Sequence, residues 1–128
     1  MDPKSLRYAE SHEWVFLDGD VATIGITKFA VEQLTDLVFI ELPAIGRKIQ
    51  AKEPFGEIES VKAVSDLYCP VAGEVIETNA VVKADATKIA DDPFGAGWLI
   101  KLRVPAGTTL DHLLTPEQYE RQLAEEQH

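Results

Sequence analysis

Short β-type segments, separated by glycine, proline and other turn residues, run through most of this chain. β-Branched and aromatic residues, which pack well on a pleated sheet, dominate six of them. The segments are HEWVFL (12–17), VATIGI (21–26), LVFIEL (37–42), PFGEIES (54–60), GEVIET (73–78) and WLIKLRV (98–104). Many short strands are typical of a sandwich or a barrel, so the sequence predicts a mainly β fold. We expect Trp14, Phe39, Ile40 and the last segment to form most of its apolar core.

One short helix is predicted among these strands, at TKFAVEQLTD (27–36). The Thr27 hydroxyl can cap the first turn. Apolar residues recur after it at helical spacing, at Ala30, Val31 and Leu34. In contrast, AVVKADATKIADDPFGAG (80–97) is predicted to be an extended surface loop.

Two further helical segments are predicted after the last strand. The first is TTLDHLL (108–114) and the second is TPEQYERQLAEEQ (115–127). In the second, Thr115 is placed to cap the helix, Pro116 occupies the first helical position and Gln118 completes a capping box. The sequence therefore predicts a β core over about 7–104 and a C-terminal helical segment over about 108–126, in an α+β arrangement.

Length and charge limit what the chain can bind. Its 128 residues are enough for one hydrophobic core, and 22 acidic against 12 basic residues give a formal charge of −10. Such a surface repels nucleic acid and anionic lipid and favours basic protein surfaces. No apolar run approaches the roughly 20 residues of a membrane span. The opening MDPKSLRYAESHEW lacks the features of a targeting peptide. We therefore expect a protein of the reducing bacterial cytoplasm, without nucleic-acid or membrane partners.

The residue patterns of common enzymes are missing from the sequence. His12, His112 and His128 lack the spacing of metal ligands, and no serine lies in a Gly-x-Ser-x-Gly motif. Gly95-x-Gly97 lacks the third glycine of a dinucleotide-binding loop and precedes a predicted strand. The only cysteine, Cys69, can form no intrachain disulfide and is expected to behave as a small buried hydrophobe. The sequence therefore predicts a protein that is not an enzyme and binds no metal.

A single lysine, Lys62, lies in the stretch ESVKAVSDLYCPVAG (59–73), which holds no other cation. The flanking Gly56 and Pro70 and the β-branched residues favour two strands joined by a turn at 61–63. That turn contains no Asn-Gly or Asp-Gly, the strongest hairpin signal. Apolar residues also recur at every third position, as on one face of a helix, at Ile58, Val61, Val64 and Leu67. The pattern alone leaves both structures open.

Five segments, in order, resemble the H protein of the glycine cleavage system. They are SHEW (11–14), VATIGIT (21–27), LVFIELPAIG (37–46), FGEIESVKAVSDLYCPVAGEVIETN (55–79) and DPFGAGWLIKL (92–102), and the resemblance runs from about residue 7 to residue 124. It implies a single lipoyl-carrier domain over 1–128, built as a hybrid barrel-sandwich of two antiparallel sheets with small peripheral helices. It also implies that Lys62 carries lipoic acid in amide linkage at the tip of a hairpin, which favours the hairpin over the helix.

The resemblance further implies a carrier that shuttles a group between enzymes. In this family the lipoyl arm accepts an aminomethyl group from a pyridoxal-phosphate glycine decarboxylase and passes it to a tetrahydrofolate-dependent aminomethyltransferase. Dihydrolipoamide dehydrogenase then reoxidises the arm, and a lipoate ligase or a lipoyl/octanoyl transferase attaches it in the first place. Ser11, Glu13 and Asp66 match the positions that line the resting cleft of the loaded arm. Glu57, Glu59 and Asp66 would form a recognition surface or simply keep the hairpin soluble.

Two other functions remain open at this point. Small relatives of the H protein serve as lipoate carriers in bacterial sulfur oxidation, beside heterodisulfide-reductase-like enzymes, and an unmodified interaction protein would leave Lys62 bare. The chain also departs from the family pattern before and within the DPFGAG segment, where Ala86 and Ala90 replace a proline and an asparagine and Phe94 replaces a tyrosine. We expect these departures to affect how that loop is placed.

Overall fold

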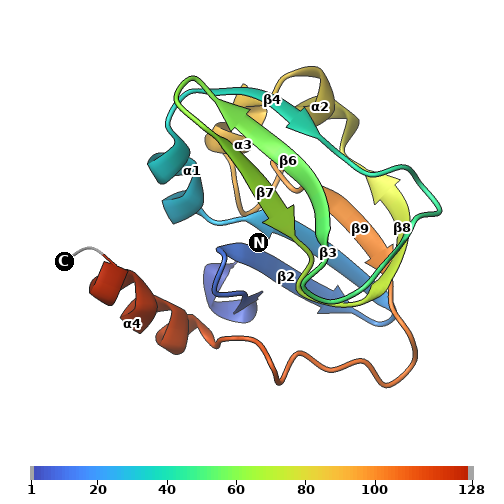
Figure 1. Ribbon diagram of the computed structural model, residues 1–128. Helices are drawn as coiled ribbons and strands as arrows, with labels where there is room; N and C mark the ends of the chain where they lie inside the picture. Colours follow the sequence, from blue (N-terminus) through green and yellow to red (C-terminus); the bar gives the residue numbers. More distant parts are fainter. Residues whose placement is uncertain (1, 127–128) are drawn as a thin grey trace.

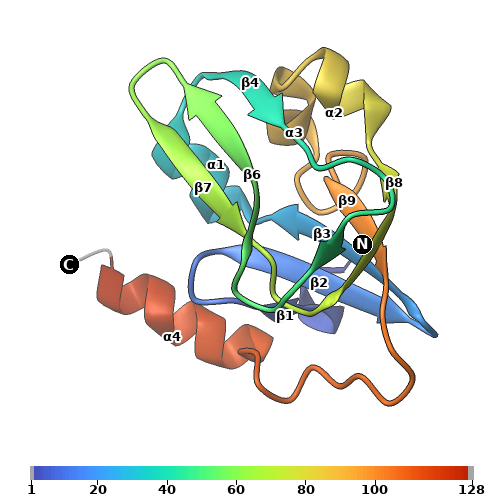
Figure 2. The same ribbon diagram turned by 45° about the vertical axis from the view of Figure 1, so that its right-hand side comes forward.

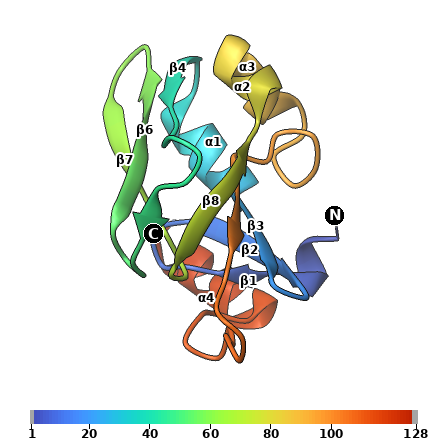
Figure 3. The same cartoon turned by 90° about the vertical axis from the view of Figure 1, so that its right-hand side faces the viewer.

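Residues 2–126 are described by the computed structural model, in which two antiparallel sheets pack against each other (Figure 1). The strands are β1 (Arg7–Tyr8), β2 (Glu13–Asp18), β3 (Val21–Ile26), β4 (Leu37–Glu41), β5 (Lys48–Ile49), β6 (Pro54–Ser60), β7 (Val64–Tyr68), β8 (Gly73–Thr78) and β9 (Ile100–Arg103). The larger sheet has the order β1-β2-β3-β9-β8-β5 and the smaller one the order β4-β6-β7. Figure 3 shows β6 and β7 on one side of the molecule and β8 and β9 on the other. The predicted two-sheet fold is confirmed, as a sandwich without a closed barrel among the described residues.

Each of the six predicted segments contains a strand, and β3, β6 and β8 have the predicted bounds. Two further strands, β1 and β5, were missed. Each is only two residues long and is held by its neighbour, through the pairs Arg7↔Val15 and Lys48↔Glu74. Two residues cannot display the alternation by which strands are recognised, so pairing alone defines these strands.

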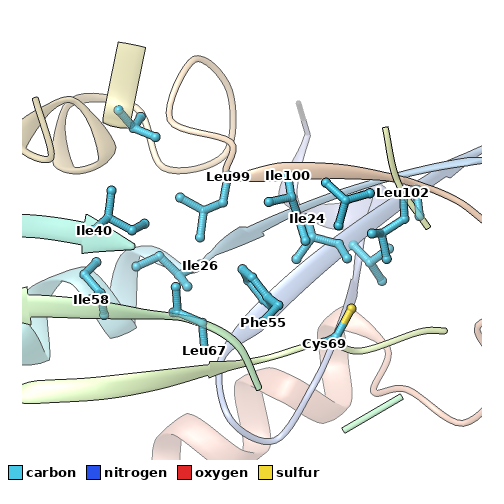
Figure 4. Packing of buried hydrophobic residues seen from close by; sticks show 14 of the residues in the cluster. Ile24, Ile26, Ile40, Phe55, Ile58, Leu67, Cys69, Leu99, Ile100 and Leu102 are labelled. Atoms are coloured by element: carbon cyan, nitrogen blue, oxygen red, sulfur yellow. The ribbon is translucent and has the colours of Figure 1, made fainter. Parts of the chain in front are cut away.

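The main core lies between the sheets and is lined by branched aliphatic side chains (Figure 4). Ile24 and Ile26 of β3 and Ile100 and Leu102 of β9 come from the larger sheet, and Ile40, Ile58 and Leu67 come from the smaller one. Burying a side chain of this size contributes about 1.5–3 kcal/mol to folding. The expectation that Ile40 and the last β segment belong to the core is confirmed.

Phe39 contradicts the predicted core, because its side chain is 52% exposed. The pairing of β4 with β6 is irregular between Leu37 and Phe39, where a β-bulge shifts the register. The bulge places Val38 and Phe39 both outside, between the buried Leu37 and Ile40. An extra residue in one strand changes which side chains face the core, and the alternation of the sequence gives no sign of it.

Trp14 is fully buried in a second cluster, with Leu6, Tyr8 and Tyr119. Its indole Nε1 donates to the carbonyls of Ile26 and Pro93, at 3.1 and 3.0 Å. The ring lies against Gly25, where a Cβ would come within 2.5 Å of the indole. Trp14 thus links β3 to the loop before β9. The expectation that Trp14 is a core residue is confirmed.

The helical predictions have mixed outcomes. Helix α1 (Lys28–Leu34) is confirmed, and the Thr27 hydroxyl accepts a hydrogen bond from Ala30 N at 3.3 Å. The helix predicted over 108–114 is wrong. Leu114 there pairs with Tyr8 in an isolated β-bridge, through N–H···O bonds of 2.8 and 2.9 Å in the two directions. Seven residues are too few to hold a helix by themselves, so pairing with β1 decides this conformation.

The prediction of an extended loop over 80–97 is also partly wrong, since this segment contains helices α2 (Ala80–Ala84) and α3 (Thr87–Asp91). The Asn79 side chain caps α2 by accepting from Val81 N at 3.1 Å. Val82 and Ile89 are completely buried against the core. Burial of these two side chains stabilises helices of five residues that would not form alone.

The chain ends in helix α4 (Pro116–Glu126), and a 3-10 turn, η1 (Pro3–Ser5), precedes β1. The capping box is confirmed, because Gln118 N donates to Thr115 Oγ1 at 3.2 Å and Thr115 N donates to Gln118 Oε1 at 2.9 Å. Tyr119 of α4 stacks on Tyr8 with ring centroids 4.4 Å apart. No helix within residues 2–126 is long and apolar enough to cross a membrane.

Candidate functional site

The hairpin of β6 and β7 presents Lys62 at its tip, so the hairpin prediction is confirmed and the helical alternative is wrong. Ser60 closes the turn twice, since its backbone N–H donates to the carbonyl of Ala63 at 2.8 Å and its hydroxyl accepts from Ala63 N at 3.1 Å. Val61 N also donates to the carbonyl of Asp36, at 3.0 Å. Ser60 therefore supplies the turn chemistry that Asn-Gly supplies elsewhere, because serine favours the first position of a turn.

Lys62 is exposed, and no ion pair among residues 2–126 involves it. Its neighbours Val61 and Val64 are 72% and 59% exposed. Figure 2 shows the tip of the hairpin projecting beyond the rest of the sandwich. The Lys62 amine is thus accessible to a modifying enzyme.

A cavity of about 330 Å³ opens between β7, helix α1 and the turn that precedes β2. Its walls combine apolar side chains with about as many polar ones. The lining residues include Ile26, Phe29, Leu34, Ile58, Leu67, Ser11, Glu13, Ser65 and Asp66. Ser65, one of the lining residues, follows Lys62 by three residues, so the two Cα atoms are at most about 10 Å apart. This mixed lining suits a long hydrocarbon group that carries a polar terminus.

Glu13 is the unusual residue of this cavity. Its side chain is buried, at 1% exposure, and accepts hydrogen bonds from Ser11 Oγ and, at 3.1 Å, from Tyr68 N. No ion pair within the described residues involves Glu13. Burial raises the pKa of Glu13 from 4.5 to about 7, although these hydrogen bonds oppose the shift. A buried carboxylate without a cation is costly, so this end of the cavity favours a positively charged ligand.

This burial predicts that Glu13→Gln stabilises the protein without lipoate at high pH. The folded state binds the Glu13 proton more tightly than the unfolded state does, so the wild type loses stability as pH rises from about 4.5 to about 7. Glutamine is neutral throughout and still offers an oxygen to Tyr68 N. The variant should gain up to about 3 kcal/mol in the free energy of unfolding at pH 8 and little at pH 4.5. Urea unfolding at both pH values measures it, and an equal gain at both would contradict this origin.

The structure brings the three predicted cleft residues to one cavity but gives them different surroundings. Ser11 and Glu13 are hydrogen-bonded to each other, whereas Asp66 is exposed on the edge strand β7. By alternation Asp66 lies on the outer face of the sheet, and Ser65 lies on the inner face, opposite Ile58. Ser65 was missed in the sequence, because a serine in a half-buried strand carries no distinctive signal.

Known proteins resemble this chain in both sequence and structure. The sequence model of the family described as Glycine cleavage H-protein matches residues 6–126. The chain belongs to the glycine cleavage H-protein family. A Glycine cleavage system H protein from Rubrobacter xylanophilus is 51% identical, over 98% of this chain and 97% of that protein. One from Gloeothece citriformis is 54% identical, over 94% and 93%. The crystal structure of a glycine cleavage system H protein from Mycobacterium marinum superimposes with a TM-score of 0.88 at 39% identity, over 96% of this chain and 99% of that one.

Membership of the H-protein family supports a carrier role in glycine cleavage, and the predicted resemblance is confirmed. Cys69 is a buried structural residue, as expected. Its Sγ donates to the carbonyl of Val71 at 3.0 Å, and burial raises the pKa of the thiol to about 12. Of the departures from the family pattern, Ala86 is buried before α3, and the Phe94 ring packs 6.4 Å from the ring of Trp14.

Proposed function

We propose that this chain is a lipoyl carrier protein of glycine cleavage, with lipoic acid attached to Lys62. It carries an aminomethyl group from glycine decarboxylase to aminomethyltransferase and delivers electrons to dihydrolipoamide dehydrogenase. The observation that carries the proposal is the buried Glu13, which forms no ion pair within residues 2–126 and lines a cavity that also includes Ser65, three residues after Lys62. A cationic cargo on a long apolar arm needs these two features together.

The residues of this chain fit a lipoyl group. An amide at Lys62 removes the charge of a lysine that forms no ion pair within residues 2–126, and the exposed turn leaves room for the enzyme that forms the amide. The attached chain can lie along Ile58 and Leu67, which are apolar over the length of the cavity. When bound, the group supplies a disulfide that opens on receiving cargo and closes again on oxidation. The protein presents this group at the hairpin tip, shelters it in the cavity and provides the Glu13 carboxylate.

Glu13 and Ser11 would hold the cationic end of the cargo. An aminomethyl group ends in an ammonium, which donates hydrogen bonds and accepts none. The Glu13 carboxylate can accept one of them, and the exposed Ser11 hydroxyl can accept another after turning from Glu13. The apolar part of the lining, which includes Ile26, Phe29 and Leu34, would limit the access of water to the bound group. A sulfur-loaded arm without a cation would leave Glu13 buried and unpaired, so this residue favours glycine cleavage over the sulfur pathway.

Exposed carboxylates on the outer face of the smaller sheet support the proposal that this chain binds the enzymes named above. Glu41, Glu57 and Asp66 are direct neighbours on β4, β6 and β7, and all three are exposed. Like charges directly opposite each other on a sheet are destabilising. A row of carboxylates beside the lipoyl hairpin is suited to the basic surfaces of the decarboxylase, the aminomethyltransferase, the dehydrogenase and the lipoate-attaching enzyme. All of these encounters are proposed for the bacterial cytoplasm.

The test is to load the protein. Purified protein, lipoylated by a lipoate ligase, is incubated with glycine and glycine decarboxylase and analysed by intact mass. We expect a single lipoyl group, followed by addition of the aminomethyl cargo. A lipoylated protein that takes up no cargo would point to the sulfur-pathway carrier. A protein that stays bare in its native cell would point to an interaction protein.

A further inference from the structure

His12 lies between the two cavity residues Ser11 and Glu13, in a turn that is held in an unusual conformation. Its φ angle is 77°, in the left-handed region that residues other than glycine rarely adopt. Its backbone N–H donates to Ala9 O at 3.0 Å, and its carbonyl accepts from Thr27 N at 3.0 Å. A strained backbone persists only where its surroundings determine it, and here the side chain of His12 provides further contacts.

Three groups surround the His12 ring. Nδ1 is 2.8 Å from the Tyr119 hydroxyl, Nε2 is 3.2 Å from Glu126 Oε2, and the ring centroid is 4.9 Å from that of Phe29. Burial holds the pKa of His12 below its ordinary value, although Glu126 opposes this shift, and a lowered pKa favours the neutral ring. A carboxylate only accepts, so Nε2 carries the proton and Nδ1 accepts from Tyr119. The Tyr119 oxygen in turn lies 2.6 Å from Thr27 Oγ1, from which it can accept.

Helix α4 provides two of these three contacts. Tyr119, Gln122 and Glu126 occur at spacings of three and four residues, on one face of the helix. Gln122 Nε2 donates to the carbonyl of Glu10 at 2.9 Å, just before the same turn. The helix therefore holds the turn at three points, although more than 100 residues separate the two in the sequence. Both His12 and Glu126 also line the cavity.

We propose that His12 is a positioning residue for the cavity between β7, α1 and the turn before β2. Its ring is held by Tyr119 and Glu126 of α4, and it fixes the turn that directs Ser11 and Glu13 to the cargo. The C-terminal helix α4 thereby helps to hold the cavity in the shape that receives the loaded arm. The role at the cargo rests on the proposed function, whereas the effect on Glu13 can be measured without lipoate. If the ring loses these contacts, the turn is free to relax and water reaches Glu13. Burial is the largest cause of the raised Glu13 pKa, so this hydration should lower it.

The chain offers a matched pair of variants to test this. Tyr119→Phe removes the hydroxyl that binds His12 and keeps the stacked ring. Tyr8→Phe removes a hydroxyl from the other ring of the same stack, which binds Pro3 O and has no hydrogen bond to His12. In protein without lipoate, NMR titration of the Glu13 carboxyl should give a pKa near 7 in the wild type and in Tyr8→Phe. Tyr119→Phe should lower the Glu13 pKa by about one unit. Equal Glu13 pKa values in the two variants would overturn the proposal.

His12→Asn provides a second, independent variant, because asparagine tolerates the left-handed backbone but is too short to reach α4. It should lower the Glu13 pKa as Tyr119→Phe does, and combining the two should produce no further change. Additive effects would contradict a shared route through the His12 ring. The ¹⁵N shift of Nδ1 should also report the loss of its donor in Tyr119→Phe.

In lipoylated, loaded protein, Tyr119→Phe should shorten the lifetime of the cargo about threefold to tenfold and Tyr8→Phe should leave it unchanged. A changed Glu13 pKa together with equal lifetimes would overturn the role at the cargo. A wild-type cargo that decays as fast as in urea-unfolded protein would instead contradict the proposed function. The Glu13 titration would still decide whether His12 positions the turn.

Discussion

Lys62→Arg should leave the protein folded and abolish both lipoylation and carrier activity. Arginine keeps the positive charge and much of the length of lysine, but its guanidinium is not the amine that the ligase acylates. Because the side chain is exposed at a turn and forms no ion pair within residues 2–126, its replacement removes no packing. Intact mass after incubation with ligase and lipoate measures modification, and glycine decarboxylation assays measure carrier activity.

Lys83→Arg is the matched control for this experiment. Lys83 is also exposed, but it lies on α2 and not at the hairpin tip. The Lys83→Arg variant should be lipoylated at Lys62 and be as active as the wild type. Both variants should melt at the wild-type temperature. Glycine cleavage supported by Lys62→Arg, or a lipoyl group found elsewhere in this variant, would disprove the attachment site.

Glu13→Gln should shorten the lifetime of the loaded form by about one to two powers of ten. A sheltered, charge-assisted hydrogen bond contributes about 1.5–3 kcal/mol, and each 1.36 kcal/mol corresponds to a factor of ten. Without it, the ammonium leaves the cavity more often and meets water. Lipoylated protein is loaded with glycine and the decarboxylase, the enzyme is removed, and release of ammonia is followed. The arm without cargo should be unaffected.

Asp66→Asn serves as the internal comparison, since it removes a carboxylate that is exposed on the same cavity rim. Exposed pairs contribute about 1 kcal/mol or less, so this variant should lose no more than a few-fold in lifetime. The wild-type lifetime should also fall as the solution is acidified and Glu13 takes up its proton, whereas the lifetime of Glu13→Gln should vary less with pH. Equal ammonia release from the wild type and both variants would refute the sheltering role of these carboxylates.

The two effects of Glu13→Gln are expected to oppose each other. The same substitution should stabilise the protein without lipoate above pH 7 and destabilise the bound cargo. Both effects result from one buried carboxylate that has no ion pair among residues 2–126. A residue retained for folding alone would not behave in this way. We infer that the protein keeps a destabilising carboxylate because the cargo neutralises it.

Local patterns in the sequence predicted much of the fold. The bounds of β3, β6 and β8, the Thr27 cap and the capping box at Thr115 all depend on residues close together in the chain. Such features reflect alternation and capping chemistry that a short window contains. The predictions that were wrong, at Phe39, over 108–114 and over 80–97, depend on a bulge, a distant strand and the burial of a helix face.

The sequence by itself determined the mainly β architecture and the acidic surface. Its resemblance to a family predicted roles for Lys62, Ser11, Glu13 and Asp66. Only the tertiary structure decided that Lys62 lies at a projecting turn and that Glu13 is buried without a cation from the described part of the chain. Glu13 accepts its backbone hydrogen bond from a residue 55 positions away, and His12 meets Tyr119 across 107 positions. Burial and charge pairing are properties of packed segments and not of neighbouring residues, so the chemistry of the cavity exists only once the two sheets and the C-terminal helix have come together.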